Sequence, residues 1–221
     1  MLQFEPSALW QPNTIFEFKN ARILPNGSNL PATLYRLHNE KKDLDLYQIL
    51  TNRLKSLIDD VTEIEVDKDE KRDLLTLQLT FKDGLVLPSQ SLSDGTLRFL
   101  GLAIIEADKS RGGVICLEEP ENGINPLKIR QMVNLLKDMA TDTSLEIDAE
   151  NPLRQVIINT HSPLAVGMIM EQDLLLAKSH LVYNDFFRQK YSKPYLLPCP
   201  ILGKPKNMPC EPRHWEKYLN I

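Results

Sequence analysis

The sequence has few of the features that mark secreted or membrane-spanning proteins. Its 221 residues include only three cysteines, Cys116, Cys199 and Cys210, and their spacing fits no zinc site. No apolar run approaches the length of about 18 residues that a transmembrane helix needs. The first residues do not form a signal-peptide pattern. These absences predict a reduced, cytoplasmic setting in which the membrane is not a partner.

A strong charge of one sign is also lacking. The formal net charge is −4, so the overall charge does not indicate nucleic-acid binding. A local basic patch is still compatible with this net charge. Hydrophobic residues make up 42% of the chain, which is enough for a substantial core. The length has room for one large domain, or for one domain with an appendage.

The most informative stretch runs from Leu92 to Pro163 and contains three short motifs. The first is LSDGT, from Leu92 to Thr96. The second is VICLEEPENGINP, from Val114 to Pro126, and the third is VIINTHSP, from Val156 to Pro163. The order and spacing of the three motifs indicate more than any one of them does alone.

The middle motif predicts a strand that ends in two acids. The apolar run Val114–Leu117 is typical of a buried strand in a mainly parallel sheet, and Glu118 and Glu119 follow it. In open α/β sheets, ligands bind at the carboxyl ends of the strands. One carboxylate there can hold Mg²⁺, and a second can orient or deprotonate an attacking water. A solvated acidic pair at the end of a strand is the alternative.

The first motif predicts the start of a helix. Ser93 or Asp94 can cap a helix that continues through the apolar residues 96–105. Gly95 would allow a ligand to approach the backbone closely, and a free helix N-terminus attracts anions. Taken alone, an ordinary capped helix explains the same residues.

The third motif predicts another strand, Val156–Asn159, followed by a loop. Ser162 can cap a helix that begins at Pro163. His161 would then lie at the carboxyl end of this strand, where an imidazole can donate a hydrogen bond to a phosphate oxygen. A purely structural histidine is the alternative.

Together the motifs resemble those of ABC-type ATPases, the clan that includes the SMC and RecF proteins. The chain is most similar to RecF-like bacterial ATPases of the AAA family, many of which are linked to phage defence and DNA metabolism. LSDGT resembles the signature motif, VICLEEP the Walker B strand, ENGINP the D-loop and NTHSP the switch-histidine loop. The segment NGSNLPATLYRL, from Asn26 to Leu37, also resembles this group, and the likeness covers roughly residues 20–170.

The resemblance implies a role for each of these residues. Glu119 would orient or deprotonate water, and His161 would sense the γ-phosphate of ATP. Glu118 would take the Mg²⁺-side acidic position, where the clan usually has Asp. Asn125 would face the partner of a dimer formed through an ATP sandwich. The residues implied to contact ATP held by the second subunit are Ser93, Asp94, Gly95 and Thr96.

One motif of this clan is missing, the Walker A sequence G-x-x-x-x-G-K-[ST]. The only Gly-Lys pair, Gly203-Lys204, is followed by Pro205. The Walker A loop supplies the backbone cradle and the lysine for the phosphates. Micromolar ATP affinity needs about 8 kcal/mol, whereas a helix terminus supplies about 0.3–2 kcal/mol for an anion. The chain is therefore predicted to be a C-terminal lobe that binds ATP and Mg²⁺ only with a Walker A lobe, supplied by upstream sequence or by a partner chain.

Periodicity predicts the remaining elements. Helices are expected over residues 44–61 and 126–140, and a hairpin is expected to join a half-buried strand at 75–81 to residues 85–87. The other predicted segments are an irregular start over 1–33 with a short strand at 15–18, loops at 67–73 and 141–152, and a strand at 174–177.

The order of strands and helices predicts an α/β fold with a mainly parallel sheet, flanking helices and a β-hairpin before the signature helix. Residues 1–170 form the predicted ATPase lobe. Residues 171–221 form a proline-rich extension with eight Lys and Arg against five Asp and Glu. This extension could touch DNA or an effector subunit, or pack as a surface segment.

Three hypotheses follow from the sequence. The first is the ATP-hydrolysing head fragment of a RecF- or SMC-like ATPase that acts in DNA metabolism or phage defence. The second is a non-hydrolytic dimerisation or regulatory module that keeps relic motifs. The third is a decayed gene fragment that folds poorly.

Overall fold

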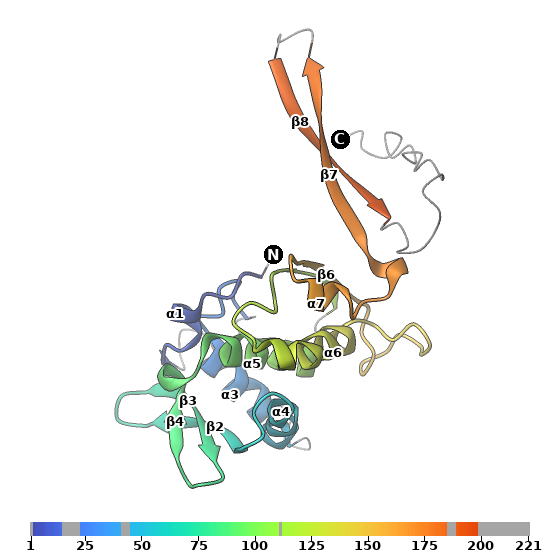
Figure 1. The fold of residues 1–221 in the computed structure, drawn as a ribbon. Helices are drawn as coiled ribbons and strands as arrows, with labels where there is room; N and C mark the ends of the chain where they lie inside the picture. The colour runs from blue at the N-terminus through green and yellow to red at the C-terminus, as the bar shows by residue number, and fades with distance from the viewer. Residues whose placement is uncertain (1, 15–22, 41–44, 111, 185–188, 199–221) are drawn as a thin grey trace. The chain divides into compact units, whose positions relative to one another are not determined.

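The computed structural model describes residues 2–14, 23–40, 45–110, 112–184 and 189–198, which fall into two units. The first unit, Met1–Ala165, holds an antiparallel sheet and a pair of parallel strands, with helix α5 (Asp94–Ala107) between them (Figure 1). The second unit, Val166–Ile221, contains an antiparallel hairpin of β7 (Leu175–Asn184) and β8 (Gln189–Pro198). The strand predicted at 174–177 is the start of β7, whereas the strand predicted at 15–18 lies outside the described residues.

The antiparallel sheet has the order β1-β3-β2, and β4 also pairs with β3. Leu75, Leu77 and Leu79 of β3 are buried and alternate with half-buried polar residues, as a strand with one covered face requires. A turn at Gly84 brings β4 back against β3, and this confirms the hairpin predicted before the signature helix. The strands of this sheet are β1 (Asn13–Thr14), β2 (Val61–Asp69), β3 (Leu74–Phe81) and β4 (Val86–Pro88).

Strand β2 corrects two predictions. The helix predicted over 44–61 is the shorter α4 (Leu46–Lys55), and β2 occupies the beginning of the loop predicted at 67–73. Val61, Ile64 and Val66 of β2 are buried, but the register shifts between Val61 and Glu63. Because this β-bulge interrupts the period of two, the apolar residues of β2 do not alternate regularly in the sequence.

Helices α4 and α5 and an additional helix, α3 (Leu30–Glu40), supply most of the remaining core of the first unit. Helix α3 begins within the stretch 1–33 that was predicted to be irregular. Pro31 does not prevent this helix, because it occupies the first turn, where proline is tolerated. Leu34 of α3, Leu50 of α4 and Phe99 of α5 are at most 1% exposed. Helix α5 is buried along nearly its whole length, as its apolar composition predicted.

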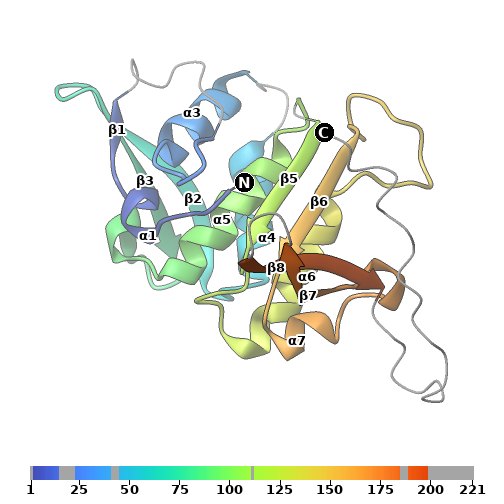
Figure 2. The same cartoon turned by 90° about the horizontal axis from the view of Figure 1, so that it is seen from above.

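The parallel pair contains the strands predicted from the second and third motifs. Strands β5 (Gly113–Glu118) and β6 (Arg154–Asn159) pair in parallel register and lie over α5 and α6 (Ile129–Met139), as Figure 2 shows. On their other face, Val114 and Ile157 are 62% and 50% exposed. The expectation of a mainly parallel sheet holds for this pair alone among the described strands. Strands β2, β3 and β4 are joined by short turns, which permit only antiparallel pairing.

The N-terminal segment covers one edge of the parallel pair. The backbone N–H of Leu2 donates to the carbonyl oxygen of Cys116 at 2.7 Å, and Leu2 forms an isolated parallel bridge with Leu117. The ring of Phe4 packs against Gly101 of α5, where a Cβ would lie 2.8 Å from the ring. On its other edge, β6 has no neighbouring strand within the described residues.

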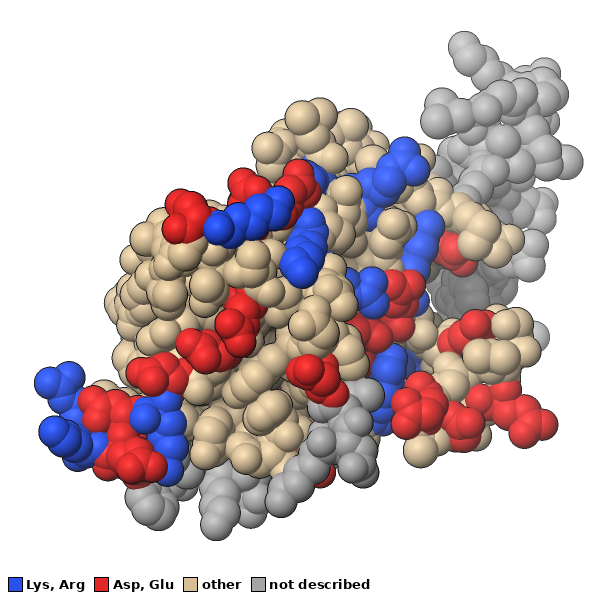
Figure 3. Space-filling view, turned by 90° about the horizontal axis from the view of Figure 1, so that it is seen from below, with Lys and Arg blue, Asp and Glu red and all other residues tan. Residues whose placement is uncertain are grey.

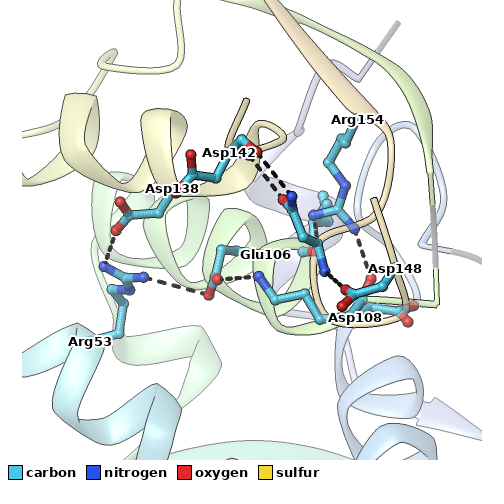
Figure 4. A network of polar contacts seen from close by, with 10 residues as sticks. Arg53, Glu106, Asp108, Asp138, Asp142, Asp148 and Arg154 are labelled. Atoms are coloured by element: carbon cyan, nitrogen blue, oxygen red, sulfur yellow. Dashed lines mark hydrogen bonds and ion pairs between the residues drawn. The ribbon is translucent and has the colours of Figure 1, made fainter. Parts of the chain in front are cut away.

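Two arginines fix the helices beneath the parallel pair (Figure 4). Arg53 of α4 contacts Glu106 of α5 at 3.6 Å and Asp138 of α6 at 2.7 Å. Arg154 of β6 is 3% exposed, and its guanidinium donates to the carbonyl oxygens of residues 105 and 108 at the end of α5. Burial lowers the pKa of this guanidinium, although Asp108 and Glu106 act in the opposite direction. These contacts join α4, α5, α6 and β6 into one support for the strand ends.

Charges of both signs alternate over the face in Figure 3, and acidic residues gather at one end of it. The loop between α6 and β6 has the acidic, exposed character predicted for residues 141–152, with Asp142, Glu146, Asp148 and Glu150 exposed. The Ser144 side chain and backbone donate hydrogen bonds to Asp142, and they lower the pKa of that carboxyl. None of the helices in the described part of the chain has the length and apolar character needed to span a bilayer.

Candidate functional site

Glu118 and Glu119 lie at the carboxyl end of β5, where the sequence placed them. Glu118 is the last residue of the strand and is half-buried opposite Asn159 of β6. Glu119 has a φ of 43°, which is in the left-handed region that a residue with a side chain seldom adopts. Its N–H donates to the carbonyl oxygen of Asn159 at 2.8 Å, so a bond to β6 holds this conformation. Strained backbone of this kind clusters at active sites and ligand clamps.

The chain then forms a tight turn, referred to below as the 119–124 turn. The N–H of Asn122 donates to the carbonyl oxygen of Glu119, and that of Ile124 donates to the carbonyl oxygen of Glu121, both at 3.0 Å. Gly123 has a φ of 80°, a conformation that suits glycine. The turn is thus closed by its own backbone bonds, which hold residues 121–124 of the ENGINP motif together.

The 119–124 turn packs directly against the N-terminus of α5. A Cβ on Gly95 would overlap the carbonyl oxygen of Gly123, and a Cβ on Gly123 would lie 3.2 Å from the backbone nitrogen of Gly95. The sequence predicted that Gly95 lets a ligand approach the backbone. The close approach in the structure is to Gly123 of the same chain, and contact with ATP remains a prediction.

The residues around Gly95 form the predicted cap. The Ser93 hydroxyl accepts a hydrogen bond from the N–H of Thr96 at 3.3 Å and lies 2.8 Å from the Thr96 hydroxyl. Ser93 and Asp94 are exposed, whereas Gly95 and Thr96 are buried. Of these four residues, only Ser93 and Asp94 therefore present side chains to the outside.

His161 lies in the loop after β6. Because β5 and β6 are adjacent parallel strands in register, Glu119 and His161 follow neighbouring strand ends. His161 is exposed, whereas Thr160 and Ser162 on either side are half-buried. The Ser162 hydroxyl accepts a hydrogen bond from the N–H of Ala165 at 3.3 Å and so caps the four-residue helix α7 (Pro163–Val166), as predicted.

Asn125 is the fifth residue of the ENGINP motif and begins the next helical segment. Its side-chain oxygen accepts a hydrogen bond from the N–H of Leu127 at 3.0 Å, which confirms the predicted cap. The first turn, Pro126–Lys128, is a 3₁₀ helix that leads into α6. Asn125 is exposed, and its position toward a dimer partner remains a prediction.

One contact of the site was missed from the sequence. Glu121 is 9% exposed, and its carboxylate accepts a hydrogen bond from the hydroxyl of Thr160. This bond joins the 119–124 turn to the histidine loop across 39 positions of the chain. Glu121 lies within the ENGINP motif, but the motif does not indicate that its side chain turns inward.

The described side chains include no group of three or more His, Cys, Asp or Glu that could hold a metal ion by themselves. Mg²⁺ in ATPases is usually bound by one or two carboxylates together with waters and substrate phosphates. Glu118 is half-buried at the strand end, and its role as the Mg²⁺ ligand remains a prediction.

The chain belongs to the family described as "AAA domain, putative AbiEii toxin, Type IV TA system", whose model matches residues 33–167, more than half of the 221 residues. It is therefore an AAA-type ATPase domain. No curated protein matches the chain.

Several solved structures show a distant similarity. One is from a study of ATP-driven dimerization and DNA-stimulated activation of SMC ATPases; it is 8% identical, with a TM-score of 0.43, and 72% of this chain and 89% of that chain are covered. The Smc head domain with a coiled coil and joint from Pyrococcus yayanosii is 12% identical, with a TM-score of 0.43, and 72% and 29% are covered. The Smc head domain bound to the C-terminal domain of ScpA, from Pyrococcus furiosus, is 12% identical, with a TM-score of 0.44, and 79% and 41% are covered. The chain thus spans less than half of the two Pyrococcus chains.

Proposed function

We propose that the chain is the signature and Walker B lobe of an ATPase head, and that it hydrolyses ATP once a Walker A lobe completes it. The observation that carries the proposal is the left-handed backbone of Glu119, held by its bond to Asn159 beside the histidine loop. A carboxylate carried by backbone that is held at a strand end is suited to orient or deprotonate water. Family membership supports the same class of activity.

The exposed face of the parallel pair supports the need for a second lobe. Parallel strands are normally covered on both faces, but Val114 and Ile157 are at least half exposed. The 221 residues contain no Walker A sequence, so this chain lacks the usual phosphate cradle. A lobe that brings the cradle and covers this face would supply both missing parts.

Each of the other residues has a defined part in this proposal. His161 donates a hydrogen bond to the γ-phosphate, and Glu118 holds Mg²⁺, which when bound neutralises charge on the phosphates. Ser93 and Asp94, the exposed signature residues, contact ATP held by the second subunit of a dimer, and Asn125 lies at that interface. Gly95 and Thr96 support them from within the N-terminus of α5.

The test has a binding arm and a turnover arm. Isothermal titration calorimetry with Mg-ATP should detect no micromolar binding to the chain alone, and binding should appear when a partner with a G-x-x-x-x-G-K-[ST] segment is added. In that assembly, Glu119→Gln should reduce turnover about 10²–10⁴-fold. The matched control is Glu63→Gln, which changes an exposed acid on β2 and should leave turnover unchanged. Wild-type turnover in Glu119→Gln would remove Glu119 from the mechanism.

The absence of a Walker A sequence favours a second function, a dimerisation or regulatory module that binds no nucleotide. Calorimetry separates the two, because this module would bind no Mg-ATP with any partner. A cooperative thermal transition of the isolated chain would argue against a decayed fragment.

An action in phage defence or DNA metabolism is part of the first proposal, and loss of that phenotype in a Glu119→Gln strain would test it.

A further inference from the structure

Glu121 is a buried acid to which the proposed function assigns no part. It is 9% exposed, and one carboxylate oxygen accepts a hydrogen bond from the hydroxyl of Thr160. The other oxygen is buried and has no hydrogen-bond partner among the described residues. Burying a carboxylate with only part of its hydrogen-bonding capacity filled costs free energy. Stability alone therefore does not explain an acid at this position.

The Thr160 hydroxyl makes a second hydrogen bond, on the other side of His161. It accepts from the backbone N–H of Ser162 at 3.0 Å. One side-chain oxygen thus contacts the 119–124 turn and the residue that follows His161. Threonine has few χ1 rotamers because its Cβ is branched, so the bond to Glu121 selects where this hydroxyl lies. The bond from Ser162 to Thr160 thus closes a short turn of backbone with His161 at its centre.

We propose that Glu121 is a positioning residue, which holds the backbone of His161 through the hydroxyl of Thr160. The importance of the held imidazole rests on the proposed function, whereas the structural link does not depend on it. Without Glu121, the Thr160 hydroxyl loses the acceptor that orients it, and the exposed imidazole of His161 then samples more positions.

The same turn connects this link to the signature motif. Gly123 lies in contact with Gly95, and the carbonyl oxygen of Glu121 closes the turn by accepting from Ile124. A shift of the N-terminus of α5 would therefore move the Glu121 backbone, and the Thr160 bond would carry that shift to His161. The imidazole is thus coupled to the signature loop through the Gly95–Gly123 backbone contact and the Glu121–Thr160 side-chain bond.

Nuclear magnetic resonance of the full chain with isotope-labelled histidine tests the link without nucleotide. The chain has four histidines, and the His161→Gln variant identifies the His161 signal. Glu121→Ala and Thr160→Val should each shift and broaden that signal, and the double variant should add no further change. Glu121→Gln and Thr160→Ser keep an acceptor and a hydroxyl, so they should leave the signal close to its wild-type position.

The control for a general loss of structure is Thr141→Val. The Thr141 hydroxyl is likewise a side-chain group that holds a loop, here the loop after α6. It donates to the carbonyl oxygens of Pro152 and Arg154 at 2.8 and 3.0 Å and accepts from the N–H of Arg154. This variant should leave the His161 signal in place. An unchanged signal in Glu121→Ala, or an equal shift in Glu121→Gln and Glu121→Ala, would overturn the proposal.

In an assembly with a Walker A lobe, Glu121→Ala should lower kcat about 10–100-fold with little change in KM, as expected when a catalytic group is misplaced rather than lost. If the wild-type assembly hydrolyses no ATP, the proposed function fails while the resonance result still decides the link. If the assembly hydrolyses ATP and Glu121→Ala keeps the wild-type kcat, the positioning role fails alone.

Discussion

Gly95 and Gly123 are in direct backbone contact, so that a Cβ on Gly95 would overlap the carbonyl oxygen of Gly123. One glycine lies in the first turn of α5 and the other lies in the turn after β5. Their contact explains why a small residue is required at both positions, and it fixes the distance between these two loops.

We expect Gly95→Ala to lower the free energy of unfolding by about 2 kcal/mol, because the obstacle is backbone that cannot move aside. In an unobstructed helix the same change would be stabilising. Urea denaturation of the full chain measures the effect. The matched control is Gly101→Ala in the same helix, where the obstacle is the ring of Phe4, which can move, and the expected loss is under about 1 kcal/mol.

The left-handed backbone at Glu119 predicts that glycine is more stable there than alanine. The free energy of unfolding of Glu119→Gly should exceed that of Glu119→Ala by about 0.5–1 kcal/mol. The reason is that relief from a backbone strain of about 1–2 kcal/mol outweighs the extra freedom of glycine in the unfolded chain. Neither variant should support ATP turnover. The same pair at Glu63 of β2, where φ is not positive, should have the opposite order. An order at residue 119 that matches the order at residue 63 would show that the backbone there is not strained.

Removal of the Arg154 guanidinium should destabilise the support beneath the strand ends. Arg154→Met deletes the donors to two carbonyl oxygens at the end of α5 and leaves those oxygens buried, at a cost of about 2 kcal/mol. Thermal or urea unfolding reports the loss. Arg130→Met on the exposed side of α6 serves as the control and should change stability by no more than about 0.5 kcal/mol.

The raised pKa of Tyr47 predicts that the free energy of unfolding falls at high pH. Burial is the main cause that raises the pKa of its hydroxyl from 10.0 to about 12. The folded state therefore keeps the proton longer than the unfolded chain does. This contribution to stability is complete below about pH 10 and is lost as the pH rises through about 12. Absorbance of tyrosinate in the wild type minus that in Tyr47→Phe should show a step near pH 12, and a step near pH 10 would contradict the prediction.

The parts of the site that depend on local chemistry could be predicted from the sequence. Ser93 and Asn125 cap helices as expected, and Glu119 and His161 follow neighbouring strand ends, because capping and strand ends are properties of a few adjacent residues. The contact of Glu121 with Thr160 could not be predicted in this way. This contact depends on how the 119–124 turn packs against the histidine loop. In the sequence, an acid two positions before a glycine in a polar motif is typical of an exposed turn.

The sheets show the same division. The alternation of Leu75, Leu77 and Leu79 indicated β3. Strand β2 was not predicted, because the β-bulge after Val61 interrupts its alternation of buried and exposed residues. Among the described strands, the predicted parallel sheet consists of β5 and β6, because the number of strands in a sheet depends on long-range pairing that periodicity does not report.

The uncovered side of β5 and β6 has a thermodynamic consequence. Any molecule that binds the native form of this face, and not the unfolded polypeptide, raises the unfolding free energy by RT ln(1 + [L]/Kd). The melting temperature of the chain should therefore rise with the concentration of a true companion lobe, in the absence of ATP. Candidate companions can be ranked by this shift alone, before any assay of hydrolysis exists.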